Sequence, residues 1–212
     1  MPTESTKPIQ CQPAPDAPVP SIPQPVQFPK TIYINYFDGI NEPKVKALMG
    51  MLSQIVAQQK PETLYFLFSS PGGSVDAGIV FYNFLRALPV EIVMHNTGSV
   101  DSIGTVIFLA GTRRYSALHS SFLFHGVQSI FPANIPFSPA QVSERLSRLK
   151  QDEAKIAGII AARTKLTEVE IQQLFRQGES KDLTFAEEKG IIHEVRDAAI
   201  PKDAPFITVN LN

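Results

Sequence analysis

The sequence has little of what several protein classes require. It has one cysteine among its 212 residues, Cys11, which rules out an internal disulfide and fits a reducing compartment. No segment approaches the roughly 20 apolar residues of a membrane span. The first 30 residues also lack the apolar core of a secretory signal. We therefore expect a cytoplasmic protein that does not contact a membrane.

An excess of one charge is also missing. The 19 basic and 20 acidic residues leave a formal net charge of −1, which gives no footprint for nucleic acid. Three histidines, His95, His119 and His193, have no partners at metal-ligand spacing, so we expect no metal. The segment SPGGSVDAG (70–78) lacks the lysine of a phosphate-binding loop, and we expect no cofactor.

Proline, in contrast, is concentrated in residues 1–29, which predicts a flexible leader. Residues 30–198 then predict one domain, followed by a C-terminal tail at 199–212. Within the domain, short apolar segments alternate with helical periodicity, which is typical of an α/β fold with a parallel sheet. Strands are expected at 31–37, 64–70, 90–96, 121–125 and 191–195, and helices at 42–58, 75–85, 105–112, 138–163, 166–175 and before Gly190.

Two glycine-rich turns each follow a predicted strand and precede a predicted helix. They are SPGGS (70–74) and TGSVDSIG (97–104). Gly72 and Gly73 allow a substrate to approach the backbone closely, and helix N-termini present unpaired N–H groups. This arrangement is suited to binding an oxyanion, although a tight turn with a purely structural role would have the same residues.

Ser102 and His125 are the candidate pair for nucleophilic catalysis. Ser102 stands directly before an apolar helix, and His125 ends an apolar strand. A histidine near a serine acts as the general base that a hydroxyl nucleophile requires. Each residue also has an ordinary alternative, because serine is a common helix N-cap and a lone histidine is usually structural.

Four motifs give the sequence a resemblance to the proteolytic subunit of the Clp protease, ClpP. They are SSPGGSVDAG (69–78), GSVDSIGT (98–105), SFLFHG (121–126) and AEEKGIIHEV (186–195), and the resemblance covers residues 30–195. It implies a crotonase-type fold of repeated β-β-α units with a parallel central sheet and a protruding long helix. It also implies a serine peptidase with Ser102 as nucleophile, His125 as base, the N–H groups of Gly73 and Ile103 as oxyanion hole, and Gly72 and Asp101 beside the substrate.

The sequence departs from the family at the third member of the triad. The family has an aspartate there, whereas an ungapped alignment places Gly178 at that position. Glu179 is the first candidate to replace it, because a shift of one residue would bring its longer side chain to the imidazole. Asp182 is the alternative, although it is better suited to capping the next helix. Asp101, before the nucleophile, replaces a small apolar residue of the family.

The sequence departs from the family in two further segments, and both affect which partners can be expected. The segment QSIFPANIPFSP (128–139) replaces a glycine-rich stretch of the family, and the leader replaces its axial loop. A docking loop for an unfoldase is therefore not recognisable. The long helix at 138–163 predicts a homo-oligomer formed through it.

Three functions remain open at this stage. The first is a peptidase that forms an acyl-enzyme on a peptide or protein substrate. The second is an inactive scaffold that keeps only the fold and its oligomer surface. The third is a crotonase-type enzyme acting on an acyl-CoA thioester.

Overall fold

The computed structural model describes residues 30–130 and 133–209, so the predicted leader lies outside it. Eight strands form one sheet with the order β6-β5-β3-β2-β1-β8, and β4 and β7 extend it beside β3. All neighbours pair in parallel except β5 and β6. The strands are β1 (Thr31–Phe37), β2 (Thr63–Ser70), β3 (Glu91–Asp101), β4 (Arg113–Ser116), β5 (Ser121–Leu123), β6 (Ser180–Lys181), β7 (Glu194–Val195) and β8 (Phe206–Thr208).

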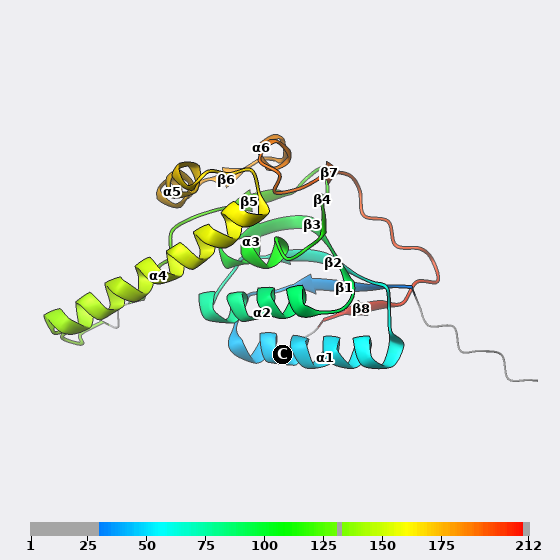
Figure 1. The fold of residues 1–212 in the computed structure, drawn as a ribbon, viewed down its shortest axis with the longest axis horizontal. Helices are drawn as coiled ribbons and strands as arrows, with labels where there is room; N and C mark the ends of the chain where they lie inside the picture. Colours follow the sequence, from blue (N-terminus) through cyan, green and yellow to red (C-terminus); the bar gives the residue numbers. More distant parts are fainter. Residues whose placement is uncertain (1–29, 131–132, 210–212) are drawn as a thin grey trace, which may run out of the picture.

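Helices α1, α2 and α3 lie next to one another on one face of this sheet, and α4 projects well beyond it (Figure 1). The helices are α1 (Glu42–Gln59), α2 (Val75–Ala87), α3 (Ile103–Phe108), α4 (Pro139–Arg163), α5 (Glu168–Gln177) and α6 (Leu183–Glu188). The mostly parallel sheet with its projecting helix agrees with the predicted fold class. In the described parts of the chain, no helix is long and apolar enough to cross a membrane.

The sheet centre is where the apolar pattern predicted it. Strand β2 is buried along most of its length, because α1 and α2 cover one of its faces and β1 and β3 flank it. Helix α1 turns Val45, Leu48, Leu52 and Ile55 toward the core. The carboxyl end of β2 is thereby fixed at Ser70, the first residue of the SPGGS segment.

Strand β3 is longer than predicted. It continues through Asp101, so the residues expected to form a second glycine-rich turn are extended strand instead. The reason is pairing: Ser99 and Val100 align with Ser121 and Phe122 of β5, and Ser69 Oγ accepts a hydrogen bond from Ser99 N–H at 3.2 Å. The chain therefore turns only at Ser102.

Three strands were not predicted. Strand β4 lies where a turn was expected, β6 lies where no element was expected, and β8 lies within the predicted tail and pairs with β1. All three are short and pair with strands elsewhere in the chain, so periodicity gave little signal for them. Helix α3 ends at Phe108, four residues before the predicted end, and all six of its residues are buried.

The predicted start of α4 is confirmed. Ser138 accepts a hydrogen bond from Gln141 N–H while the Gln141 side chain accepts from Ser138 N–H, which is a capping box. The other end of α4 is held by the buried side chain of Arg114, which donates to four carbonyl groups, those of Gly111, Arg163, Gly190 and Ile191. Burial lowers the pKa of Arg114 to about 10.

Candidate active site

Ser102 occupies the turn between β3 and α3 in a backbone conformation that serine rarely adopts. Its φ and ψ are 55° and −129°. Its N–H donates to Leu123 O at 2.8 Å, and its carbonyl accepts from Thr105 Oγ1 at 2.7 Å. The hydroxyl makes no capping hydrogen bond to α3. Ser102 is therefore not an ordinary N-cap, and the strained turn resembles the conformation in which hydrolases expose a nucleophilic serine.

Gly72 lies against this turn, Gly73 lies against Ile40, and both positions require glycine. Their φ angles are 88° and 146°. A Cβ added at Gly72 would lie 2.7 Å from Ser102 Cβ, and one added at Gly73 would lie 2.1 Å from Ile40 O. The SPGGS turn is held in place because Ile40 N–H donates to Gly72 O and Ser74 N–H donates to Ile40 O, each at 2.8 Å.

The two predicted oxyanion donors are the N–H groups of Gly73 and Ile103. Ile103 is the first residue of α3, so its N–H has no partner within the helix. Gly73 is held in an isolated parallel bridge with Ile40 that uses the neighbouring groups, Gly72 O and Ser74 N–H. Both residues line the same cavity as Ser102.

His125 also lines this cavity, which has a volume of about 300 Å³. The structure therefore brings Ser102, His125, Gly73 and Ile103 together from three separate motifs. The imidazole Nδ1 lies 2.7 Å from Gly126 O. Among the hydrogen bonds of the described residues, none joins Ser102 Oγ to His125.

The position predicted for the third member of the triad lies near the side chain of His125. A Cβ added at Gly178 would lie 3.8 Å from His125 Cβ, but Gly178 itself ends α5 and has no side chain. The Glu179 carboxylate lies 3.3 Å from Lys181 Nζ and its side chain is 65% exposed. Asp182 caps α6, accepting a hydrogen bond from Phe185 N–H at 2.9 Å. Glu179 and Asp182 thus form their ion pair and hydrogen bond with groups other than His125.

Asp101 directs its carboxylate to its own strand. Ser99 Oγ donates to Asp101 Oδ2 at 2.5 Å. Because residues two apart in a strand share a face, the two side chains lie side by side on β3. Gly72, the other predicted substrate-side residue, lies against Ser102, since a Cβ added there would meet the Ser102 Cβ.

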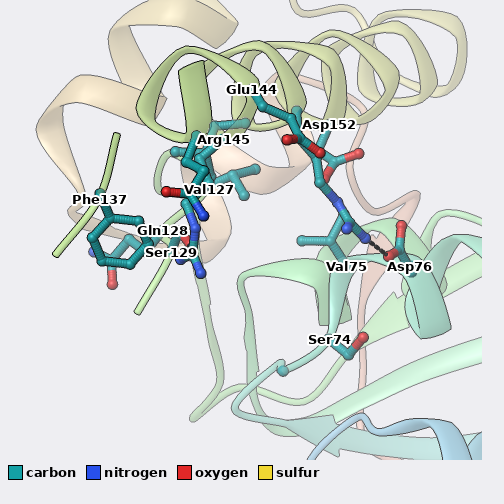
Figure 2. Close-up of a pocket in the computed structure, with 14 residues that line it drawn as sticks. Ser74, Val75, Asp76, Val127, Gln128, Ser129, Phe137, Glu144, Arg145 and Asp152 are labelled. Carbon is teal, nitrogen blue, oxygen red and sulfur yellow. Dashed lines mark hydrogen bonds and ion pairs between the residues drawn. The ribbon is translucent and has the colours of Figure 1, made fainter. Parts of the chain in front are cut away.

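A second, larger cavity of about 560 Å³ adjoins the first. The two share Gly73, Val75, Val127 and Gln128. Figure 2 shows Glu144 and Asp152 projecting from α4 above the start of α2, and Arg145 beside Val127, Gln128 and Ser129. An ion pair between Arg148 and Asp76 spans from α4 to α2 at 2.5 Å. The serine thus lies at one end of a longer groove beneath α4.

One feature next to His125 was missed by sequence reasoning. Glu153 of α4 accepts a hydrogen bond from Val127 N–H at 3.0 Å, two residues after His125. The only sequence signal was Gly126, which could indicate a close approach of another group. No cluster of three metal-ligating side chains occurs within residues 30–130 and 133–209.

Comparisons with known proteins agree with this geometry. The ATP-dependent Clp protease proteolytic subunit 2 of Pseudomonas aeruginosa is 30% identical over 127 residues, which are 57% of this chain and 62% of the relative. A Clp protease proteolytic subunit of Bigelowiella natans is 33% identical over 112 residues, 51% of this chain and 56% of the relative. These matches span less than two thirds of the relatives' length.

The fold has a solved counterpart. The structure of a ClpP1 point mutant from Listeria monocytogenes superposes with a TM-score of 0.67 at 19% identity, covering 80% of this chain and 92% of that one. The family model described as Clp protease matches residues 27–199. That match includes both glycine-bearing segments, Ser102, His125 and the whole of α4. The chain therefore belongs to the Clp protease family.

Proposed function

We propose that this chain is a serine peptidase that cleaves peptide bonds through an acyl-enzyme on Ser102. The observation that carries the proposal is the uncapped Ser102 hydroxyl at a strained turn, which shares one cavity with His125. Family membership supports the same activity. A serine that served only as a helix cap would not need a backbone with positive φ.

The reaction would follow from the positions of these groups. Ser102 Oγ attacks the substrate carbonyl carbon while its proton passes to His125 Nε2. The N–H groups of Gly73 and Ile103 stabilise the negative charge that develops on the carbonyl oxygen. The imidazolium then gives its proton to the leaving amine, and water activated by His125 hydrolyses the ester on Ser102.

The groove beneath α4 suits an extended substrate. The 300 Å³ and 560 Å³ cavities are continuous through Val127 and Gln128, so a chain bound at Ser102 continues along α4. Gln128, which lines both cavities, is exposed and offers backbone groups with which an extended peptide can pair. A peptide or unfolded protein segment is therefore the substrate class that we propose.

Fluorophosphonate labelling tests the proposal directly. Such a probe phosphonylates only an activated serine, so we expect one adduct on the purified protein by intact mass. The adduct should be absent from Ser102→Ala, which has no nucleophile. It should form at least about 100-fold more slowly in His125→Ala, because the general base is lost.

The matched control is Ser74→Ala, which removes an exposed hydroxyl from the N-cap of α2 near the same groove. It should still label. An adduct that persists in Ser102→Ala, or no adduct on the folded wild-type protein, would contradict the proposed chemistry.

A second candidate function is an inactive scaffold of the same family. The specific observation in its favour is Gly178, which leaves no carboxylate at the position beside His125. A folded oligomer that binds partners but never labels with the probe is the outcome that this alternative expects.

We also propose that the chain assembles with copies of itself through α4. The helix projects from the domain and carries Val142 and Leu146, which are 46% and 50% exposed, on one face. The relatives that match this chain are named as subunits of an ATP-dependent protease. An unfoldase is accordingly a candidate partner.

A further inference from the structure

The peptide bond between Gly126 and Val127 lies between His125 and a carboxylate from another element. Its carbonyl oxygen is 2.7 Å from His125 Nδ1, and its N–H donates to Glu153 Oε1 at 3.0 Å. Both groups belong to one planar unit, because the peptide link is rigid. One peptide group and two hydrogen bonds therefore link Glu153 to the imidazole.

The contact with the carbonyl determines which nitrogen of His125 carries the proton. A carbonyl oxygen accepts hydrogen bonds and cannot donate them, so Nδ1 must hold the hydrogen in this contact. In the neutral ring, Nε2 then has a free lone pair. This is the tautomer that a general base for Ser102 requires.

Glu153 controls the orientation of that carbonyl. In a trans peptide the C=O and N–H point in opposite directions, so anchoring the Val127 N–H on α4 turns the Gly126 C=O toward the ring. Hydrogen bonds linked in a chain also polarise one another, and the carboxylate thus makes the carbonyl a stronger acceptor. A second anchor is the Gly126 N–H, which donates to Phe175 O at 3.0 Å.

Two observations indicate that the contact is specific. A Cβ added at Gly126 would lie 2.7 Å from Glu153 Oε1, so only glycine allows the carboxylate to come this close. Across the described part of the chain, Glu153 forms no ion pair and no other hydrogen bond. A partly buried carboxylate without a cation is costly, and its one contact is with the segment that carries the base.

We infer that Glu153 is a positioning residue that fixes the reactive tautomer of His125 through the Gly126–Val127 peptide. It orients the imidazole of His125, a role that Gly178 cannot have because it lacks a side chain. The inference rests on the proposed function for its catalytic consequence. The state of the ring, however, can be measured whether or not the protein hydrolyses anything.

The test is the ¹⁵N chemical shifts of the ring nitrogens in histidine-labelled full-length protein at a pH where the ring is neutral. His125→Ala assigns the signals of His125. We expect the Nδ1–H form to predominate in the wild type and the two forms to mix in Glu153→Ala. We also expect fluorophosphonate labelling of Glu153→Ala to be about tenfold slower, comparable to losing one hydrogen bond.

Two further variants keep the test decisive. In Glu153→Gln the amide oxygen still accepts from Val127 N–H, so the tautomer is retained and labelling stays within about threefold. Glu153→Met keeps a side chain of similar length without an acceptor for the Val127 N–H. It replaces Glu153→Ala in the test if that variant fails to fold. Glu188→Gln, at the exposed end of α6, is the charge control and should match the wild type.

A predominant Nε2–H form in the wild type overturns the inference, as does a folded Glu153→Ala or Glu153→Met with wild-type ring shifts. Glutamine behaving like alanine overturns it as well. If the wild-type protein does not label at all, the proposed function fails, and the ring shifts still decide the role of Glu153.

Discussion

Ser102 illustrates how far single residues can be interpreted from sequence. Its position before an apolar helix was also consistent with a cap, while the pairing with His125 and the family resemblance favoured a nucleophile. The structure argues against the cap, because φ is positive and the hydroxyl does not bond to α3. Backbone strain leaves no sequence signal unless glycine is present, so it could not be predicted.

The environment of His125 could be predicted only in part. Gly178, which the ungapped alignment placed at the third position, lies near the side chain of His125. The Gly126 carbonyl and Glu153 were missed, because a peptide plane's orientation and a contact spanning 26 positions depend on tertiary packing. Glu179 as third member stays a prediction, and its carboxylate lies near Lys181.

Restoring a carboxylate at position 178 should increase activity. Gly178 has φ 60° and ψ 37°, a conformation in which aspartate costs only ~1 kcal/mol of stability. In Gly178→Asp the new side chain lies beside His125 and stabilises the imidazolium, so we expect the labelling rate to rise at least about tenfold. The rate is followed by intact mass.

The control is Gly178→Asn, which has the same shape and tolerates the same backbone but has no charge. It should label at close to the wild-type rate. An equal gain in both variants would show that rigidity of the loop, and not the carboxylate, is responsible.

At the scale of elements, helices were predicted more accurately than strands. The capping boxes of α4 and α5 mark their starts because the side-chain bonds are local. Strand β3 was predicted too short, since its second half depends on pairing with β5. Arg114 gave no usable signal either, because its four carbonyl partners come from separate parts of the chain.

The capping box of α5 predicts a specific dependence on pH. Glu170 Oε1 lies 2.5 Å from Lys189 Nζ after α6, and this bond, followed by those from Thr167, lowers the pKa of Glu170 from 4.5 to about 2. Because the folded pKa is the lower one, the stabilisation is fully present above pH 4.5 and is lost as the pH falls toward 2. In Glu170→Gln this contribution is absent at every pH.

Urea unfolding between about pH 6 and about pH 3 measures the effect. Glu170→Gln should be less stable than the wild type at the higher pH, and the difference should shrink at the lower one. Glu168→Gln, in the same first turn but outside the capping box, is the control. A difference that does not change with pH would exclude titration of Glu170 as its cause.

At the scale of the whole molecule, α4 is the element that extends away from the domain. If copies of the chain pack through it, Leu146→Glu places a charge in an apolar interface. Burial of a leucine contributes about 1.5–3 kcal/mol, so each contact should weaken by at least about tenfold. Size-exclusion chromatography with light scattering should therefore show a smaller assembly at equal concentration.

Ser147→Glu introduces the same charge one position along the same exposed helix and serves as control. It should preserve the wild-type mass. Identical masses for Leu146→Glu and the wild type would place the oligomer contact elsewhere.

The pairing of β1 with β8 also has a consequence for biosynthesis. Tyr33 N–H donates to Pro205 O at 2.9 Å, and Tyr33 aligns with Phe206. The outer edge of β1 is synthesised before its partner strand, because β8 lies far downstream in the sequence. Until β8 has been made this edge stays open to other strands, and a chaperone that shields it would be most useful during that interval.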